Sequence, residues 1–364
     1  MTLCFTGAKN LHTERWVTYF AKCGYEVHLI IDEPVDYEGV IIHCLNLEVK
    51  KNLSYLFKKL FRIKRLIRKI KPDILHAHTI TTEGYICALT GFHPFVVTIW
   101  GSDIYLRPHT GWEERLFTQL VLKRADLVTA DSQDQIDAAV ALGGHPSKCE
   151  VIQWGVDLNL FHPMDAAAIR TRLGFGDDPV VLSPRKFTPL YNIDVILRAF
   201  KDVLQTLPAA KMIITGSGAG EEEIKTLVHH LDLEESIHFT GYVDYNELPL
   251  YLAVADVSIS VPSSDGTAMA ILEALACEVP LIVSDLPSNH EWIEDRINGL
   301  IVPVQNQEAL ASSMLDVLQN RTAYRDRFKA QNRQLVHERA DQEANMKKMD
   351  VFYQQLIEIS HHKS

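Results

Sequence analysis

The chain has 364 residues and a formal net charge of −11 at pH 7, with 47% hydrophobic and 23% charged residues. This length suggests two domains, and the composition is that of a soluble globular protein. Six scattered cysteines without a C-x-x-C pair argue against a disulfide framework and a zinc site. Because the sequence shows neither a secretory signal nor a run of 18 apolar residues, it predicts a cytoplasmic protein.

Short apolar runs alternate with amphipathic segments through the first half of the chain. Helices are expected between the runs, for example at Glu14–Cys23, Leu53–Ile70 and Trp112–Arg124. Continuous β-branched runs that alternate with helices indicate a parallel sheet covered on both faces, so this half predicts a doubly wound α/β domain. The predicted strands are LCFTG (3–7), EVHLII (26–31), GVIIHCL (39–45), DILHAH (73–78), FVVTIWG (95–101), LVTAD (127–131) and CEVIQWG (149–155).

The predicted helix Leu53–Ile70 lies within a basic segment, Lys50–Lys71, that contains ten Lys or Arg residues and no acid. Its apolar residues recur every three or four positions, so one face is expected to pack on the sheet. The basic face is either simply solvated or attracted to an anionic membrane surface, which would make the protein peripheral on the inner face of the membrane. No other segment is as basic, so a nucleic-acid-binding protein is not expected. The apolar stripe consists of Leu53, Leu56, Phe57, Leu60, Ile63, Ile67 and Ile70.

A second series of strands and helices begins after a domain boundary expected near Phe161–Ala166. It predicts a second doubly wound parallel sheet, and the carboxyl edges of two such sheets would form a ligand-binding cleft. The tail from about Gln307 to Glu358 is expected to be helical, with an interruption near Ala340–Asp341. The predicted strands are PVVLSP (179–184), KMIITGSG (211–218), SIHFTGY (236–242), VSISV (257–261), PLIVSD (280–285) and GLIVP (299–303), and the helices are Ile193–Leu204, Glu221–Leu231, Glu247–Ala253, Met269–Cys277 and Ser288–Arg296.

Three loops that follow strands of the second series carry charged or small residues. Arg185 and Lys186 in SPRKFTPLYN follow a strand directly, where a basic side chain either binds phosphate or stays solvated. The glycines of TGSGAGEEEI favour a tight turn into a helix over phosphate binding, because three glutamates follow them. In DGTAMAILE (265–273), Asp265 and Glu273 flank a helix start whose free amides favour a diphosphate. Sugar hydroxyls would be partners for the buried carboxylates, and the alternative is an ordinary salt bridge of Glu273.

The segment DGTAMAILEALACEVPLIVSDLPSNHEWI resembles the E-x7-E signature of retaining glycosyltransferases of the GT-B fold, the group 1 or family four type. Asp265 stands in place of the first Glu. KPDILHAH, TIWGSD and VIQWGVDLNLFHP resemble other segments of that family, so that the resemblance covers nearly the whole chain. It implies two Rossmann-like domains with an interdomain cleft: an acceptor domain of residues 1–163 with a C-terminal helix at about 343–364, and a donor domain of residues 164–342.

The resemblance also implies a role for individual residues. Arg185 would neutralise the leaving diphosphate, Asp265 would contact the transferred sugar, and Glu273 would bind the ribose. Asp103 is the polar candidate on the acceptor-side loop, because Trp100 stands where many members have a catalytic His. The other donor-binding candidates are Lys186, Gly216, Gly241, Tyr242, Val243, Gly266, Thr267, Ala268 and Met269, and the acceptor-side candidates are His12, His78, Trp100 and His109.

The expected activity is that of a retaining, metal-independent hexosyltransferase, which moves a sugar from a nucleotide diphospho-sugar to a glycan or lipid-linked acceptor in polysaccharide or glycoconjugate biosynthesis. No cofactor and no metal are expected, since the sugar nucleotide is a substrate and His76 and His78 lack an evident third ligand. With no dedicated base, positioning and charge stabilisation would carry the reaction. Two alternatives remain: a nucleotide-sugar epimerase on the same fold, and a weakened sugar-nucleotide-binding protein, because Leu190–Asn192 replaces a Lys-Gly pair of the family.

Overall fold

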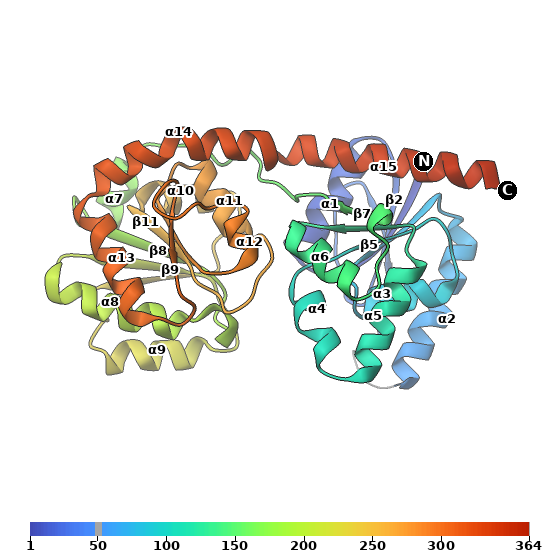
Figure 1. Cartoon of the computed structure of the whole chain (residues 1–364), viewed down its shortest axis with the longest axis horizontal. Helices are drawn as coiled ribbons and strands as arrows, with labels where there is room; N and C mark the ends of the chain where they lie inside the picture. The colour runs from blue at the N-terminus through green and yellow to red at the C-terminus, as the bar shows by residue number, and fades with distance from the viewer. Residues whose placement is uncertain (48–52, 364) are drawn as a thin grey trace. The chain divides into compact units, whose positions relative to one another are not determined.

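The computed structural model describes residues 1–47 and 53–363, which fold as two compact units. Unit 1 consists of Met1–Trp154 together with Glu343–Ser364, and unit 2 consists of Gly155–Gln342. Each unit is built on one parallel sheet with helices packed on it (Figure 1). The expected α/β class, with two doubly wound parallel sheets, is therefore confirmed.

Unit 1 contains a seven-stranded parallel sheet in the order β3-β2-β1-β4-β5-β6-β7. The winding direction reverses between β1 and β4, and ligands bind at such reversals in open parallel sheets, at the carboxyl ends of the strands. The strands are β1 (Thr2–Thr6), β2 (Glu26–Ile31), β3 (Val40–Cys44), β4 (Ile74–His78), β5 (Phe95–Thr98), β6 (Leu127–Ala130) and β7 (Cys149–Val151).

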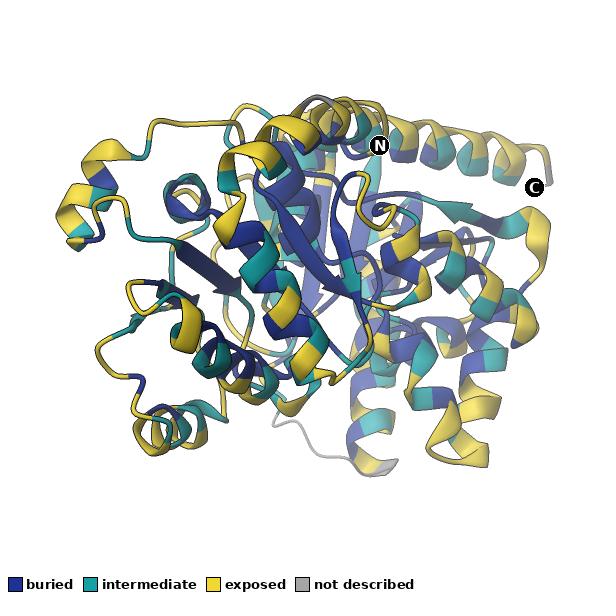
Figure 2. Ribbon diagram, turned by 60° about the vertical axis from the view of Figure 1, so that its left-hand side comes forward, coloured by how far each residue is buried: buried dark blue, intermediate teal, exposed yellow. Residues whose placement is uncertain are grey.

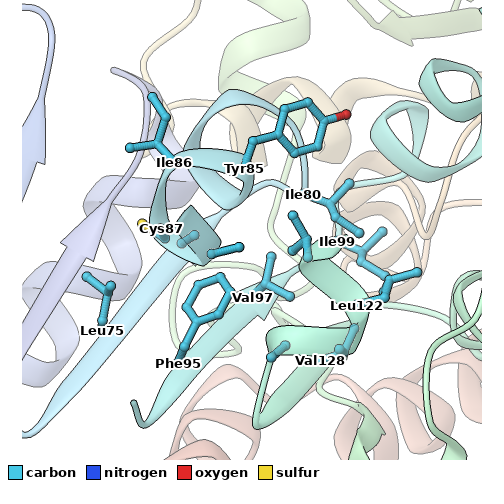
Figure 3. Close-up of a cluster of buried hydrophobic side chains, with 14 of the residues drawn as sticks. Leu75, Ile80, Tyr85, Ile86, Cys87, Phe95, Val97, Ile99, Leu122 and Val128 are labelled. Carbon is cyan, nitrogen blue, oxygen red and sulfur yellow. The ribbon is translucent and has the colours of Figure 1, made fainter. Parts of the chain in front are cut away.

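Helices pack on this sheet through fully buried apolar side chains. Figure 3 shows part of that core, with Phe95 and Val97 of β5 in its middle and Leu122 of a helix beside them. The burial colouring of Figure 2 shows the same layering, with buried central strands and exposed outer helix faces. The helices are α1 (Leu11–Lys22), α2 (Leu53–Ile70), α3 (Thr82–Thr90), α4 (Ser102–Tyr105), α5 (Trp112–Arg124) and α6 (Gln133–Ala141), with the 3-10 turns η1 (Arg107–His109) and η2 (Pro146–Lys148).

Helix α2 has the predicted bounds, but the predicted apolar stripe was partly wrong. Phe57 is 63% exposed, whereas Lys59, expected on the solvent face, is 3% exposed. The Lys59 ammonium lies 2.6 Å from Asp32 and 3.2 Å from Glu83, and these two carboxylates compensate the cost of burying a lysine. The helix is therefore turned so that Tyr55, Lys59, Ile63 and Ile67 face the unit. Lys50 and Lys51 of the basic segment lie outside the described residues.

Unit 2 contains a six-stranded parallel sheet in the order β10-β9-β8-β11-β12-β13. Its winding reverses between β8 and β11, which are hydrogen-bonded neighbours. The strands are β8 (Val180–Pro184), β9 (Lys211–Thr215), β10 (Ile237–Gly241), β11 (Val257–Ser260), β12 (Leu281–Ser284) and β13 (Leu300–Val302), and the helices are α7 (Ala167–Leu173), η3 (Pro189–Tyr191), α8 (Ile193–Thr206), α9 (Glu221–His230), α10 (Leu248–Val254), α11 (Met269–Ala276), α12 (Pro287–His290), α13 (Gln307–Gln319) and α14 (Arg321–Arg339).

The helix predicted at Ser288–Arg296 was wrong beyond its first turn, because α12 ends at His290. After α12, hydrogen bonds from the Asn298 side chain take the place of the backbone bonds that a longer helix would form. Its amide nitrogen donates to the Trp292 carbonyl at 2.8 Å, and its amide oxygen accepts from the Glu294 N–H at 2.7 Å. Local bonds of this kind compete with helix formation.

The tail consists of α13, α14 and a last helix, α15 (Gln342–Lys363), which belongs to unit 1 from Glu343 onward. The interruption near Ala340–Asp341 is confirmed. Tyr353 of α15 is fully buried in unit 1, where its hydroxyl lies 2.5 Å from His76 Nδ1 and its ring 5.1 Å from that of Phe20. The last helix is thus part of the core of unit 1.

The boundary between the units lies after Trp154 rather than near residue 163. The intervening residues pack within unit 2, since Val156 and Phe161 are buried in its core and the Phe161 ring lies 5.1 Å from that of Tyr245. Val156 is also bound to the break after α14, where its N–H donates to the Ala340 carbonyl at 2.7 Å and its carbonyl accepts from the Gln342 N–H at 3.2 Å.

Replacing Gly155 by Ala is expected to destabilise the protein through this junction. Gly155 has φ +72°, and an added Cβ would lie 2.5 Å from the Cα of Gln342. The left-handed backbone alone costs about 1–2 kcal/mol, and the clash adds to it. Gly174→Ala is the control, because Gly174 has φ +70° but no atom within 4 Å of the added Cβ. Equal losses of thermal unfolding midpoint in the two variants would contradict the prediction.

Candidate functional site

Parallel strands bring the predicted donor residues to one edge of unit 2. Arg185 follows β8 directly, and Asp265 lies in the loop after β11, the neighbouring strand. Because both strands end at the same edge, residues 80 positions apart in the chain come into contact there. Helix α11 begins just after that loop, so its first amides belong to the same edge.

The Arg185 guanidinium is held between a carboxylate and an aromatic ring. Its Nη2 forms an ion pair with Oδ2 of Asp265, and its Cζ lies 4.1 Å from the centroid of the Tyr191 ring. The Arg185 side chain is 9% exposed and that of Asp265 is 22% exposed. Burial alone would lower the pKa of Arg185, but the charges and hydrogen bonds of Asp265 and Tyr191 together outweigh it and the pKa is raised. The guanidinium is therefore a fixed cation at the edge of the sheet.

The glycines after β9 make room for the backbone next to Arg185. A Cβ at Gly216 would lie 2.8 Å from the Arg185 carbonyl oxygen, and one at Gly218 would lie 2.6 Å from that of Phe187. The Gly220 N–H donates to the Phe187 carbonyl at 3.0 Å. These contacts give the glycines a packing role, in line with the prediction that they are not primarily a phosphate loop. Gly216 remains a predicted donor contact.

Helix α11, which begins at this edge, is almost entirely buried. Glu273 is 5% exposed and every residue of Ala270–Ala276 is buried. The Thr267 hydroxyl accepts a hydrogen bond from the Trp292 indole N–H at 3.0 Å, and the Gly266 N–H donates to Oδ1 of Asp265 at 3.1 Å. The helix start is thereby fixed from both sides, with Ala268 at its cap position and no side chain capping it.

The remaining donor candidates lie on the surface of unit 2. Lys186 is exposed, and Tyr242 is 78% exposed. Gly241 has φ +68° at an irregularity in the pairing of β10 with β9, and Val243 and Met269 are half-buried. The structure thus brings Arg185, Asp265 and the start of α11 together, and leaves Lys186 and Tyr242 open to solvent.

In unit 1 an aromatic cluster gathers at the carboxyl edge of the sheet. The His12 ring lies 4.2 Å from Trp154 and 5.7 Å from Trp100, and the His78 ring lies 5.7 Å from Trp100 and 5.2 Å from Trp16. Trp100 and Trp154 are 5.0 Å apart. Three of the four acceptor-side candidates therefore meet in one cluster. His109 is the exception: it is exposed on η1, outside the contacts of this cluster.

Both histidines of the HAH segment are buried. His76 is bound on both ring nitrogens, by Tyr353 and by the Thr98 hydroxyl at 2.7 Å. His78 Nδ1 lies 3.3 Å from the Thr13 hydroxyl, and within the described residues its Nε2 has no hydrogen-bond partner. Burial lowers the pKa of His78 to about 3 and that of His76 well below its usual value. Both rings are therefore neutral at physiological pH.

Asp103 lies where its carboxylate binds backbone amides. Oδ1 accepts from the Trp100 N–H at 2.9 Å and Oδ2 from the Ile80 N–H at 3.0 Å. Burial raises its pKa to about 6, and these amides act in the opposite direction. The contacts show that Asp103 joins the loop after β4 to the loop after β5. Its catalytic role remains a prediction.

Two residues at these sites were missed at the sequence level. Tyr191, read only as a departure from the family pattern, supports Arg185. Trp154 follows β7 closely and contacts both His12 and Trp100. The rule that strand ends carry function could have singled out Trp154, because it stands near the carboxyl end of the predicted strand CEVIQWG.

Comparison with known proteins assigns both units to related families. Residues 165–335 match the profile described as "Glycosyl transferases group 1", and residues 2–132 match that described as "Glycosyl transferase 4-like". The solved structure of Anabaena HepE in complex with UDP and glucose superposes with a TM-score of 0.85 at 18% identity, covering 98% of this chain and 100% of that one. This similarity confirms the GT-B fold.

Two curated relatives indicate the kinds of enzyme the chain is similar to. The GDP-mannose-dependent alpha-(1-6)-phosphatidylinositol monomannoside mannosyltransferase of Mycolicibacterium smegmatis is 28% identical over 274 residues, which are 71% of this chain and 70% of that protein. The alpha-monoglucosyldiacylglycerol synthase of Streptococcus pneumoniae is 29% identical over 174 residues, 46% of this chain and 39% of that protein.

Acid is expected to destabilise unit 1 through the neutral histidines. Their pKa values are lowered by folding, so below about pH 6.5 the unfolded chain binds protons that the folded chain does not, and stability falls as pH falls. At pH 5.5 one such histidine accounts for roughly 1.4 kcal/mol of lost unfolding free energy. His78→Asn should therefore lose less stability between pH 7.5 and 5.5 than the parent in urea unfolding. His109→Asn is the control and should follow the parent; identical pH dependence in all three proteins would contradict the assignment.

Proposed function

Since this chain belongs to the group 1 glycosyltransferases, we propose that it transfers a sugar from a nucleotide diphospho-sugar to a glycan or lipid-linked acceptor. The observation that carries this proposal is the meeting of Arg185, Asp265 and the start of α11 at one edge of the unit 2 sheet. A cation, a carboxylate and the amides of a helix start are the groups that bind a diphosphate next to a sugar. The phospholipid and diacylglycerol acceptors in the names of the relatives support a lipid-linked acceptor.

On the donor side, we assign each group to one part of the sugar nucleotide. Arg185 binds the diphosphate, Asp265 accepts hydrogen bonds from the transferred sugar, and Glu273 accepts them from the ribose. The amides of Gly266, Thr267 and Ala268 face the diphosphate from the helix start. The burial of Glu273 supports this assignment, because a carboxylate withdrawn from water gains most from hydroxyl partners.

On the acceptor side, the aromatic cluster of unit 1 is the proposed platform. Trp100 and His12 are half-buried, so parts of both rings reach the surface of unit 1. Aromatic faces attract the weakly positive C–H face of a sugar ring, and neighbouring polar groups orient its hydroxyls. Asp103 supports this platform indirectly, because its carboxylate accepts a hydrogen bond from the Trp100 N–H and so fixes the loop that carries Trp100.

Retention of configuration follows if the departing diphosphate serves as the base. The bond from the anomeric carbon to the diphosphate breaks, the bond to the acceptor oxygen forms on the same face, and the acceptor proton passes to the diphosphate. Arg185 and the amides of α11 stabilise the negative charge that develops on the leaving group, so this route needs no metal. In this proposal unit 2 holds the donor and unit 1 holds the acceptor.

Acceptor dependence separates transfer from the rival functions. A transferase consumes the donor when a lipid-linked or glycan acceptor is present, a nucleotide-sugar epimerase converts it without an acceptor, and a pure binding protein leaves it unchanged. The experiment incubates the protein with UDP- and GDP-sugars, with and without acceptor, and follows the release of nucleoside diphosphate. Conversion without acceptor, or none at all, would overturn the proposal.

Glu273→Gln is expected to weaken donor binding about 10-fold or more, because a hydrogen bond to a charged acceptor contributes about 1.5–3 kcal/mol. The measurement is the thermal shift produced by UDP- and GDP-sugars, since ligand binding raises apparent stability by mass action. Glu234→Gln is the control, because Glu234 lies on the surface of unit 2, away from this edge. Equal shifts in Glu273→Gln and the parent would remove Glu273 from the site.

We also propose that unit 1 contacts an anionic membrane through α2. Phe57 and Phe61, one helical turn apart, are 63% and 71% exposed, and Lys58, Arg65 and Arg68 are exposed beside them. An exposed aromatic pair on a basic helix is the pattern of peripheral lipid binding, and each basic residue adds up to about 1 kcal/mol.

A second exposed apolar pair lies on α5 of the same unit. Trp112 and Leu116 are 72% and 55% exposed. Helix α3 packs against both α2 and α5, and the three helices lie side by side in unit 1 (Figure 1). No helix of the described ranges has the length and apolar composition needed to cross a bilayer. The proposed contact is therefore at the surface of the membrane.

Liposome co-sedimentation should separate the aromatic from the basic contribution. Phe57→Ser with Phe61→Ser is expected to lower binding to vesicles containing anionic lipid at both low and high salt. Arg65→Gln with Arg68→Gln should lower it mainly at low salt, because salt screens exposed charges. Met164→Ser, which removes an exposed apolar residue from unit 2, is the control. Unchanged binding of the double Phe variant, or no binding by the parent, would refute the membrane contact.

A further inference from the structure

The cation assigned to the diphosphate already has a partner in the protein. Arg185 forms its ion pair with Asp265, and Asp265 is the residue assigned to the transferred sugar. An incoming diphosphate and the Asp265 carboxylate therefore compete for one guanidinium. Because both are anions, the carboxylate also repels the phosphate as long as it stays at Arg185.

The surrounding loops hold this pair in place. The Leu190 carbonyl accepts from the Ser263 N–H at 2.9 Å, and the Asn192 side-chain amide donates to the Val261 carbonyl and the Ser263 hydroxyl, each at 2.9 Å. These bonds tie the turn that carries Tyr191 to the loop that carries Asp265. From the other side, the Ser288 hydroxyl donates to the Asp265 carbonyl oxygen at 3.0 Å.

The sequence provides little to replace Arg185 in this role. Leu190 and Tyr191, in the region where the family has a lysine, are uncharged. Lys186 is exposed to solvent. Tyr191 stacks on the guanidinium at 4.1 Å and so keeps its plane fixed without neutralising a phosphate. A diphosphate that binds Arg185 therefore draws on the same cation that Asp265 holds.

We infer that the Arg185–Asp265 pair couples recognition of the sugar to recognition of the diphosphate, so that the intact donor binds well and the free nucleoside diphosphate binds poorly. The sugar hydroxyls donate hydrogen bonds to Asp265 and replace its bond to Arg185, which frees the guanidinium for the diphosphate. A nucleoside diphosphate without its sugar has no group that satisfies Asp265. Once the sugar has left, Asp265 recaptures Arg185 and promotes release of the product. This inference rests on the proposed function and deepens it.

The test is the affinity of the full-length Asp265→Asn variant for UDP, GDP and the corresponding sugar nucleotides by calorimetry. Without the competing carboxylate, the better-bound nucleoside diphosphate should bind about 5- to 150-fold more tightly than to the parent, the range of typical coupling between sites. The sugar nucleotide should gain less or lose affinity, so that the preference for intact donor over product falls. Asp326→Asn, on the exposed surface of α14, removes the same charge and should leave both affinities unchanged.

Two further measurements keep the outcome decisive. Thermal unfolding without ligand verifies that Asp265→Asn is folded, and Asp265→Ser removes the charge with a smaller side chain if it is not. If neither variant binds nucleoside diphosphate more tightly than the parent, the coupling is refuted while the proposed function stands. If the parent binds neither nucleoside diphosphates nor sugar nucleotides, the proposed function fails and the coupling falls with it.

Discussion

The strands of each unit all run in the same direction, and the rest of the molecule follows from that constraint. Parallel strands need a crossover between them, so each strand ends in a loop at one common edge and begins at the other. In unit 2 the reversal between β8 and β11 brings Arg185 and Asp265 together from loops 80 residues apart. In unit 1 the corresponding edge gathers His12, His78 and Trp100. Backbone pairing thus brings the candidate site residues of each unit to one edge of its sheet.

Two buried ion pairs of unit 2 differ in where they lie in the sheet. Asp256 lies at the amino end of the unit 2 sheet, where it accepts from the Val180 N–H at 2.8 Å and pairs with Arg170 and Arg321 at 2.9 and 3.3 Å. Its partners satisfy it within the protein, which suits a structural role. The Arg185–Asp265 pair lies at the carboxyl end of the strands, the edge at which open parallel sheets bind ligands. The two ion pairs therefore differ in which end of the sheet they occupy, although both consist of Asp and Arg.

The sequence was most informative where a pattern is repeated along the backbone. Runs such as EVHLII predict their strand to the residue, because a parallel strand covered on both faces is a nearly continuous apolar run. The buried face of α2 was predicted wrongly because hydrophobic periodicity considers only apolar residues, whereas Lys59 is part of the buried face. Asp32 and Glu83, which make Lys59 a buried residue, come from other parts of the chain. The contact of Tyr191 with Arg185 likewise depends on the path of a turn, which hydrophobic periodicity does not predict. Both errors concern contacts between segments.

Tyr353 occupies the interior of unit 1, although it is encoded 199 positions after Trp154, the last residue of that unit's first segment. During synthesis, residues 1–154 leave the ribosome with the place of this ring empty, so that His76 Nδ1 lacks the Tyr353 hydroxyl. All of unit 2 is translated before the missing helix arrives. The strands of unit 1 are thus complete by Val151, but its core is completed only when α15 is made, and apolar surface left open until then favours aggregation.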